Sequence, residues 1–312
     1  MSKPLDRITL LSTFVRIADA GSISAAARDI GLSQPSVSRQ LAELETRLKV
    51  QLMRRTTHSL ALTDAGADLL ADARLILDSW EALEEKYLAG ETHIQGKLKV
   101  VAPVALGQMH LARIASQFQR NYPGVTFNWI LEDKPIRFAE IGCDCWVKIG
   151  QVLDETLIVR KVGTVERILA ASKDFIAEYG MPTTPKQVGE LPLIALEPFE
   201  GGHIPLHQDK RSLTIKPDVK MQTNNIFALK QAVDMGVGMA VMPKWFIANE
   251  LASGELVDLL PKWRAQSLDI HICYLPGRHQ SKRLKTFIKV IGKEIPEIEG
   301  IEPVTEIAIE GN

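Results

Sequence analysis

Residues 22–49, SISAAARDIGLSQPSVSRQLAELETRLK, decide the fold of the N-terminal region. Apolar residues recur at helical spacing on both sides of Gly31, and Ser22 and Ser33 stand where each helix needs an N-cap. Pro35 is tolerated in the first turn of the second helix, because the backbone donor that it lacks would have no partner there. The stretch therefore predicts two helices joined by a tight turn.

The spacing of Ala27, Gly31 and Val37 is typical of a helix-turn-helix motif, which we place at about residues 23–42. Closely crossing helices need a small residue at their contact, and the turn needs a residue that tolerates a left-handed backbone. A branched apolar residue on the next helix then closes the angle. The second helix should turn one apolar stripe to the core, namely Val37, Leu41, Leu44 and Leu48. The alternative is a pair of packed helices that contact no DNA.

The opposite side of the second helix carries side chains suited to the major groove. Glutamine and arginine can make bidentate contacts with base edges, and serine is short enough to allow close approach. These side chains are Gln34, Ser36, Ser38 and Arg39. We therefore expect the N-terminal half of this helix to contact base pairs.

A small hairpin, or wing, is expected to follow. Residues 52–55 and 59–62 are typical of two short strands, and Arg54 and Arg55 would meet phosphates or the edge of the minor groove. The alternative for each arginine is an ordinary solvated surface charge. A first amphipathic helix precedes the motif, so residues 1–63 are predicted to form a winged helix-turn-helix DNA-binding domain.

Charge is distributed unevenly, although the net charge of the chain is only −1. Residues 1–63 carry nine basic and five acidic side chains, whereas residues 64–91 carry eight acidic and two basic ones. A basic head is the pattern that a nucleic-acid partner requires. The charge distribution therefore favours DNA binding by the head alone.

The acidic segment, residues 64–91, carries a heptad stripe. Its apolar residues are separated by intervals of 4, 3, 4, 3 and 4: Leu69, Ala73, Ile76, Trp80, Leu83 and Tyr87. One helix cannot bury such a stripe alone, so we expect a linker helix that pairs with a second copy or with the DNA-binding domain. The alternative is a surface helix packed on its own chain.

Beyond about residue 97, strand-like runs alternate with helical stretches, which predicts an α/β fold with mostly parallel sheets. The expected strands are 98–102, 126–131, 146–149, 168–171, 193–196, 239–241 and 268–274. The clearest expected helices are 106–121, 225–235, 243–252 and 281–293.

The N-terminal segment closely resembles the DNA-binding domain of LysR-type transcriptional regulators. The matching pieces are AA at 26–27, LSQPSVSRQ at 32–40, LE at 44–45, Leu48, Arg55 and LTDAG at 62–66. The resemblance implies base contacts from Gln34, Pro35, Ser38 and Arg39, and phosphate contacts from Ser33, Ser36 and Arg55. One departure is His58, which stands where relatives often carry a wing-tip arginine.

The resemblance extends to about Lys293 through residues 98–125, 144–150, 223–245 and 251–263. It implies an effector-binding domain over 97–295, built as two α/β subdomains that resemble periplasmic binding proteins. Subdomain I would cover about 97–163 and 268–295, and subdomain II about 164–267. The chain would cross between them near 163–166 and 264–268.

A small-molecule effector, of unknown identity, is expected in the cleft between these subdomains. Ligands of such folds meet the C-terminal ends of strands and the N-termini of helices. The candidate residues are Pro103, Val104, Lys148, Gly150, Thr223 and Asn224. The alternatives are a solvated lysine and an asparagine that only caps its helix. Val104 and Ala105 stand where relatives frequently carry a hydroxyl, which favours a more apolar ligand or none.

The sequence contains no motif that predicts catalysis, a metal site or a cofactor. Cys143, Cys145 and Cys273 are too few for a disulfide framework and suit a core in a reducing cytoplasm, with redox sensing as the alternative. No apolar run approaches membrane-spanning length. Residues 296–312 hold five glutamates and no basic residue, which predicts a solvated or partly disordered acidic tail, with an interaction segment as the alternative.

The chain is thus predicted to be a cytoplasmic transcription regulator and not an enzyme. Its partners would be an imperfect inverted repeat of double-stranded DNA near a promoter, a second copy in a dimer or pair of dimers, and RNA polymerase. Three alternatives are a transport-type binding module with a helical N-terminus, an enzyme that uses the cleft, and a regulator without an effector.

Overall fold

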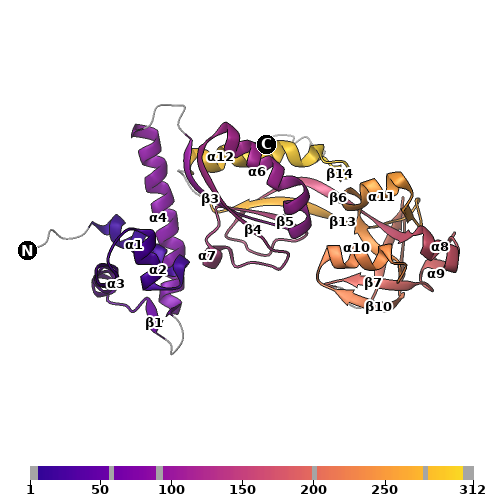
Figure 1. Ribbon diagram of the computed structural model, residues 1–312, viewed down its shortest axis with the longest axis horizontal. Helices are drawn as coiled ribbons and strands as arrows, with labels where there is room; N and C mark the ends of the chain where they lie inside the picture. The colour runs from indigo at the N-terminus through magenta and orange to yellow at the C-terminus, as the bar shows by residue number, and fades with distance from the viewer. Residues whose placement is uncertain (1–5, 56–59, 89–93, 199–201, 277–279, 305–312) are drawn as a thin grey trace, which may run out of the picture. The chain divides into compact units, whose positions relative to one another are not determined.

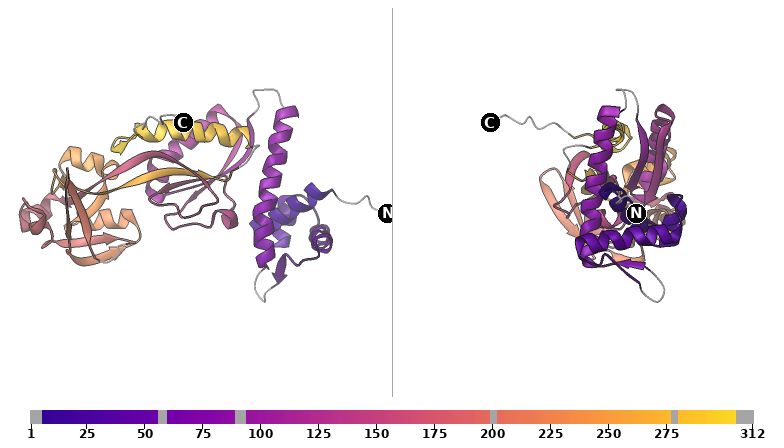
Figure 2. Two further views of the ribbon diagram at one scale, coloured as in Figure 1. Left: turned by 180° about the vertical axis from the view of Figure 1, so that it is seen from behind. Right: turned by 90° about the vertical axis from the view of Figure 1, so that its left-hand side faces the viewer.

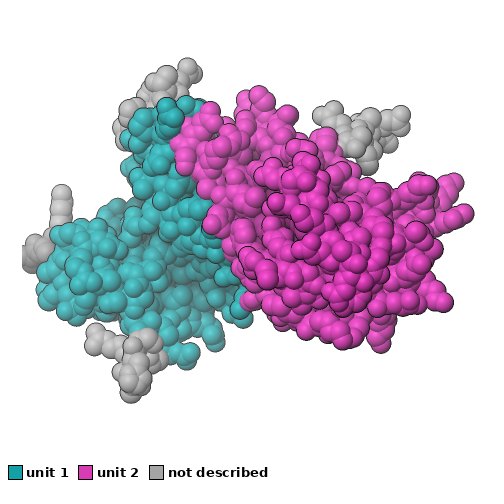
Figure 3. Space-filling model, turned by 45° about the vertical axis from the view of Figure 1, so that its right-hand side comes forward, with its two compact units in different colours: residues 1–101, 119–146, 275–287 teal, residues 102–118, 147–274, 288–312 magenta. Residues whose placement is uncertain are grey.

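The computed structural model describes residues 6–55, 60–88, 94–198, 202–276 and 280–304 and divides into two compact units (Figures 1 and 3). Unit 1 comprises residues 1–101, 119–146 and 275–287. Unit 2 comprises residues 102–118, 147–274 and 288–312. The domain boundaries drawn from the sequence stay predictions.

Unit 1 begins with the predicted winged helix-turn-helix. Its elements are α1 (Arg7–Ala20), α2 (Ile23–Asp29), α3 (Gln34–Leu48), β1 (Met53–Arg55), β2 (Leu60–Leu62) and α4 (Asp64–Leu88). Ser22 and Ser33 cap α2 and α3 as predicted, and Gly31 adopts a φ of 68° in the turn between them. Figures 1 and 2 show α1, α2 and α3 gathered against the first half of α4.

One apolar core joins these helices to α4. Its buried members include Leu10, Phe14, Ile17, Ala26, Val37, Leu41, Leu44, Leu70 and Ala73. The prediction that Leu48 faces this core is wrong, because its side chain is 45% exposed. The physical reason is that α3 ends at Leu48 and Lys49 turns the chain away with a φ of 55°.

The wing is fixed to α4 by a close backbone approach at Gly66. A Cβ atom on Gly66 would lie 2.0 Å from the carbonyl oxygen of Leu52, so this position excludes any side chain. The Leu52 carbonyl accepts a hydrogen bond from Thr63 N at 3.0 Å, and Thr63 Oγ1 accepts one from Gly66 N at 3.0 Å. The wing and α4 are therefore joined by hydrogen bonds through Thr63.

The rest of unit 1 comes from segments that continue into unit 2. They contain β3 (Gln95–Ala102), β4 (Gly124–Leu131), α7 (Phe138–Ile141), and parts of β5 (Cys145–Ile149), α6 (Ala112–Asn121) and α12 (Lys282–Glu294). β3 and β5 run parallel, with Val100 opposite Cys145 and Val101 opposite Trp146. The rings of Phe127 and Phe287 meet edge to face at 5.2 Å and bring α12 against β4.

Unit 2 holds most of the predicted effector-binding domain. Its helices are α5 (Val104–Leu106), η1 (Gly107–Leu111), α8 (Lys173–Tyr179), α9 (Pro185–Val188), α10 (Ile226–Asp234), η2 (Lys244–Ile247), α11 (Ala248–Ser253) and η3 (Ile295–Glu297). Its strands are β6 (Ile158–Ser172), β7 (Pro192–Leu196), β8 (Ile204–Gln208), β9 (Arg211–Ile215), β10 (Asp218–Thr223), β11 (Ala240–Pro243), β12 (Leu256–Asp258), β13 (Arg264–Tyr274) and β14 (Ile301–Glu302).

The α/β class is confirmed, but the expectation of mostly parallel sheets is wrong. β6 pairs antiparallel with β11, β12, β13 and β14, and β8 pairs antiparallel with β9 and β13. Within the described part of unit 2, β7 and β10 run parallel, and an isolated parallel bridge joins Leu193 to Met239. The reason is that the two chain crossings lie on β6 and β13, and these two long strands run in opposite directions along each other.

The crossings expected near 163–166 and 264–268 pair antiparallel with each other, with a shift of register between Ala265 and Leu268. Ile270 lies opposite Gly163, Leu268 opposite Val165, and Ala265 opposite Arg167.

No helix in the described part of the chain is both long and apolar enough to span a membrane.

Candidate functional site

The N-terminal half of α3 presents the side chains predicted to contact DNA. Gln34, Pro35 and Arg39 are exposed, whereas Val37, on the opposite side, is fully buried. Ser38 is half-buried beside them. We call Gln34, Pro35, Ser38 and Arg39 the recognition edge. The structure thus brings the four predicted base-contacting residues to one accessible side of one helix.

The start of α3 also suits a phosphate. Ser33 Oγ accepts a hydrogen bond from Ser36 N at 3.4 Å, and the two hydroxyls lie 2.8 Å apart. α3 has 15 residues, so its N-terminus carries a partial positive charge and backbone donors. The two serines that were predicted to contact phosphate therefore lie together at this terminus.

A buried polar pair positions α3, and the sequence interpretation missed it. Thr13 Oγ1 on α1 donates a hydrogen bond to Gln40 Oε1 on α3, and both side chains are buried. Polar side chains are rarely buried without such a partner. The available signal was a glutamine at position 40, three residues after the buried Val37 and four before the buried Leu44.

The wing is held to the far end of α3 by Glu45. Its carboxylate accepts hydrogen bonds from Leu52 N at 2.8 Å and Met53 N at 3.2 Å. Arg54 follows in β1, opposite Ala61, and its side chain is exposed. Arg55 pairs through its backbone with Leu60, but its side chain and His58 lie outside the described residues.

The heptad stripe of α4 is divided between two environments. Leu69 packs against the core of the head and Ala73 is fully buried in it. The remaining members are exposed: Ile76 by 45%, Trp80 by 45%, Leu83 by 37% and Tyr87 by 72%. The first part of the stripe therefore packs on its own chain, and the second part is an apolar surface.

The six predicted effector residues lie at two strand edges of unit 2. Because β3 and β5 run parallel with Val101 opposite Trp146, Pro103 and Lys148 follow at the same edge. Gly150 N donates to Asp269 O at 2.8 Å and the Gly150 carbonyl lies 3.1 Å from His271 Nδ1, so both backbone groups already have partners. Val104 begins the helix that continues into α6.

The second edge is formed by the parallel strands β7 and β10, where Thr223 lies opposite Leu196. Asn225 caps α10 by accepting hydrogen bonds from Phe227 N at 3.0 Å and Ala228 N at 3.1 Å, and Asn224 is exposed. A surface groove of about 490 Å³ in unit 2 lies elsewhere, between α9 and β9. None of the six predicted effector residues lines it.

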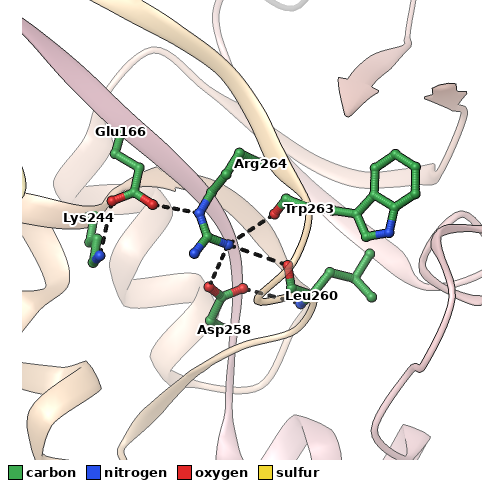
Figure 4. Close-up of polar contacts among 6 residues, drawn as sticks. All are labelled: Glu166, Lys244, Asp258, Leu260, Trp263 and Arg264. Carbon is green, nitrogen blue, oxygen red and sulfur yellow. Dashed lines mark hydrogen bonds and ion pairs between the residues drawn. The ribbon is translucent and has the colours of Figure 1, made fainter. Parts of the chain in front are cut away.

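An ion-pair network ties the two chain crossings together (Figure 4). Glu166 on β6 accepts hydrogen bonds from Lys244 Nζ at 3.0 Å and Arg264 Nε at 2.5 Å, and Arg264 also binds Asp258 at 3.2 Å. Partial burial alone would raise the pKa of Glu166, but the bonds from Lys244 and Arg264 hold it below its ordinary value. Glu166 therefore stays ionised and fixes the relative position of β6 and β13.

Two family models match the chain. The model of the bacterial regulatory helix-turn-helix protein of the lysR family matches residues 8–67, and the model of the LysR substrate binding domain matches residues 91–296. An HTH-type transcriptional repressor of Pseudomonas aeruginosa is 26% identical over 95% of each chain. The HTH-type transcriptional activator AaeR of Escherichia coli is 25% identical over 95% of this chain and 98% of the relative.

A similar fold occurs in the crystal structure of ArgP from Mycobacterium tuberculosis. The TM-score is 0.70 at 18% identity, and the match covers 96% of this chain and all of that one.

We predict that the Thr13–Gln40 pair stabilises the head as a unit. In Gln40→Leu the Thr13 hydroxyl loses its buried partner, which should lower the free energy of unfolding by about 1–3 kcal/mol. The double variant Thr13→Val with Gln40→Leu removes both polar groups and should recover most of this loss. Urea unfolding followed by circular dichroism measures both, and a double variant as unstable as the sum of the single ones would contradict the pairing.

Proposed function

The chain belongs to the LysR family of transcriptional regulators, and we propose on this basis that two copies read a two-fold related DNA site under control of an effector. It is a DNA-binding regulator with an effector-binding domain and not an enzyme. The observation that carries the proposal is the recognition edge, which is exposed along α3 while Val37 and Leu41 on the opposite side are buried.

In this proposal the recognition edge contacts bases in the major groove, with Gln34 and Arg39 as the bidentate groups. Ser33, Ser36, Arg54 and Arg55 contact phosphates and set the register of the head on the duplex. The shared serine cap at the start of α3 supports the phosphate contacts, because it leaves a helix N-terminus facing outward.

We predict different effects for arginines in the two roles. Arg39→Ala should relax base preference at one position of each half-site by about 1–3 kcal/mol, because a bidentate base contact is lost. Arg54→Ala should weaken binding to all sequences similarly. It should also reduce the slope of log affinity against log salt concentration by about one, because one fewer counterion is released. Selection of binding sites from random duplexes gives the preference, and fluorescence anisotropy at several salt concentrations gives the affinity. An unchanged site preference in Arg39→Ala would contradict the assignment of α3.

Self-association is proposed through the exposed part of the α4 stripe. An exposed row of large apolar side chains is uncommon on a monomer and typical of an interface. A two-fold dimer would also match two half-sites one helical turn apart. Tetramers would then form as pairs of dimers.

We predict that Ile76→Glu combined with Leu83→Glu abolishes this pairing, since two carboxylates cannot be buried in an apolar seam without a large desolvation cost. Sedimentation velocity should show a lower mass than the wild type at the same concentration. Asp72→Ala, an exposed position on the same helix but outside the stripe, is the matched control and should associate normally. Unchanged mass in the double glutamate variant would exclude the stripe as the interface.

The effector is proposed to bind across the two strand edges that end at Lys148 and Thr223. Both edges lie at C-terminal strand ends beside helix N-termini, where ligands of such folds bind. The Glu166 network at the crossings would set the resting arrangement that the effector changes.

We predict that a metabolite with an anionic group that pairs with Lys148 raises the melting temperature of the wild type and raises it much less in Lys148→Met, even if the rest of the ligand is apolar. A ligand at 100 times its Kd stabilises the protein by about 2.7 kcal/mol, so a thermal-shift panel of metabolites can find it. Lys186→Met, in the separate groove, is the matched control and should respond like the wild type. A response lost in Lys186→Met but kept in Lys148→Met would place the ligand in the groove, and no response to any metabolite would favour an effector-independent regulator.

The same proposal includes a cytoplasmic location and RNA polymerase as a further partner, both of which follow from transcription regulation itself. Relatives are named both repressor and activator, so either direction of control is compatible with the family.

A further inference from the structure

One face of α4, distinct from the apolar stripe, bears charged side chains that contact neighbouring elements of unit 1. Arg74, Asp78 and Glu81 follow at intervals of four and three and therefore share this face. Arg74 donates hydrogen bonds to Asp19 on α1 at 2.6 Å and to the Glu140 carbonyl on α7 at 3.4 Å. The same face thus contacts the DNA-binding head on one side and the effector-binding part of unit 1 on the other.

Asp78 of α4 and Asp144, which precedes β5, line one small cavity together with Cys143. The cavity has a volume of about 40 Å³, enough for a water molecule. Asp144 is fixed in place because its Oδ2 accepts a hydrogen bond from Lys99 N at 2.7 Å. Two carboxyl groups from different elements therefore share one confined site.

Neighbouring positive charges are already engaged by other acceptors. Arg283 on α12 is only 3% exposed and donates to Glu81 Oε2 at 2.7 Å and to the Lys97 carbonyl at 2.9 Å. Lys99 Nζ donates to the Ile141 carbonyl, and Arg74 is held by Asp19. The hydrogen bonds described for these cations thus run to Glu81, Asp19 and backbone carbonyls.

The electrostatic result is a carboxyl that resists ionisation. Burial raises the pKa of Asp78 to about 7, Asp144 and Glu81 add to the increase, and Arg283 and Arg74 oppose it. Burial also raises the pKa of Asp144, although its bond from Lys99 N and the charge of Arg283 act in the other direction. Burial is the first reason that the pKa of Cys143 rises to about 12, and Asp144 contributes to it.

We propose that α4 and the surface on which it docks in unit 1, which we call its seat and which includes Cys143 and Asp144, form a proton-controlled latch. The helix stays docked when Asp78 or Asp144 carries a proton, and it is released more readily when both carboxyls are ionised and repel each other across the cavity. The proton comes from solvent on docking and returns to solvent on release. Because Arg74 on the same face donates to the Glu140 carbonyl of α7, release also breaks this bond between α4 and the effector-binding part.

The direction of the pH effect follows from linkage. Asp78 has a raised pKa when docked and an ordinary one when α4 is released into water, so docking takes up a proton between these values. Docking therefore weakens as pH rises from about 4 to about 7 and levels off at higher pH, where Asp78 is ionised in both states. Between pH 6 and pH 8 the docking equilibrium should fall about tenfold. This goes beyond the proposed function, because it requires neither an effector nor DNA.

The accessibility of Cys143 measures the latch in the full chain. The rate of its alkylation by iodoacetamide is measured at pH 6, 7 and 8 in the native protein and in the urea-unfolded chain, with fragment ions separating it from Cys145. The ratio of the two rates is a protection factor that cancels the titration of the free thiol. In the wild type it should fall about tenfold from pH 6 to pH 8, whereas Cys273 in unit 2 should show no such fall.

Asp78→Asn mimics the protonated carboxyl, so its protection factor at Cys143 should stay within about twofold across this range. Asp72→Asn, an exposed aspartate on the same helix, should keep the tenfold fall. A flat profile in the wild type, or the same fall in Asp78→Asn, overturns the proposal. If Asp78→Asn loses protection at Cys273 as well, it is unfolded, and Asp144→Asn then decides. Removing the Asp144 charge lowers the pKa of docked Asp78, so the fall should level off at lower pH and be smaller between pH 6 and pH 8 than in the wild type. A fall as large as that of the wild type overturns the latch.

Discussion

A single helix, α4, presents three faces to three different environments, and the arrangement of unit 1 depends on this constraint. Its first turns close the core of the head through Leu70 and Ala73. Its charged face holds Asp19 of α1 and the Glu140 carbonyl of α7 through Arg74. A third face leaves the large apolar side chains of the stripe exposed. Since a helix repeats every 3.6 residues, these three sets of residues can coexist only because they occupy different angular positions.

In the head, buried polar groups fix the relative orientation of helices that apolar packing alone would not determine. Apolar contacts fix that α1 and α3 meet, but they tolerate small rotations of one helix on the other. The buried hydrogen bond between Thr13 and Gln40 is satisfied in one arrangement only, and the Glu45 carboxylate does the same for the wing. The orientation of Arg39 relative to Arg54 therefore depends on side chains outside the recognition edge.

The sequence predicted the head well, because its signals are local. Ala27, Gly31 and Val37 lie within eleven positions, and the observed helix ends agree to within about a residue. The direction of the sheet was wrong because β6 and β13 pair across about a hundred residues and the first part of β6 is exposed and charged, so only its apolar end was predicted. The Asp78–Asp144 site was missed for the same reason, since neither aspartate is unusual until folding brings them together.

The contact of α4 with the head and its contact with the effector-binding part differ in chemistry, and this difference determines which contact can separate. The contact with the head is apolar, and separating it would expose Leu70 and Ala73 to water without any compensation. The contact with the effector-binding part relies on Arg74, Asp78 and Glu81, whose charges water solvates well once they are released. Buried ion pairs add little net stability because desolvation offsets their attraction. A regulator that must transmit a change while keeping its DNA-binding head folded needs this division between a permanent apolar contact and a separable polar one.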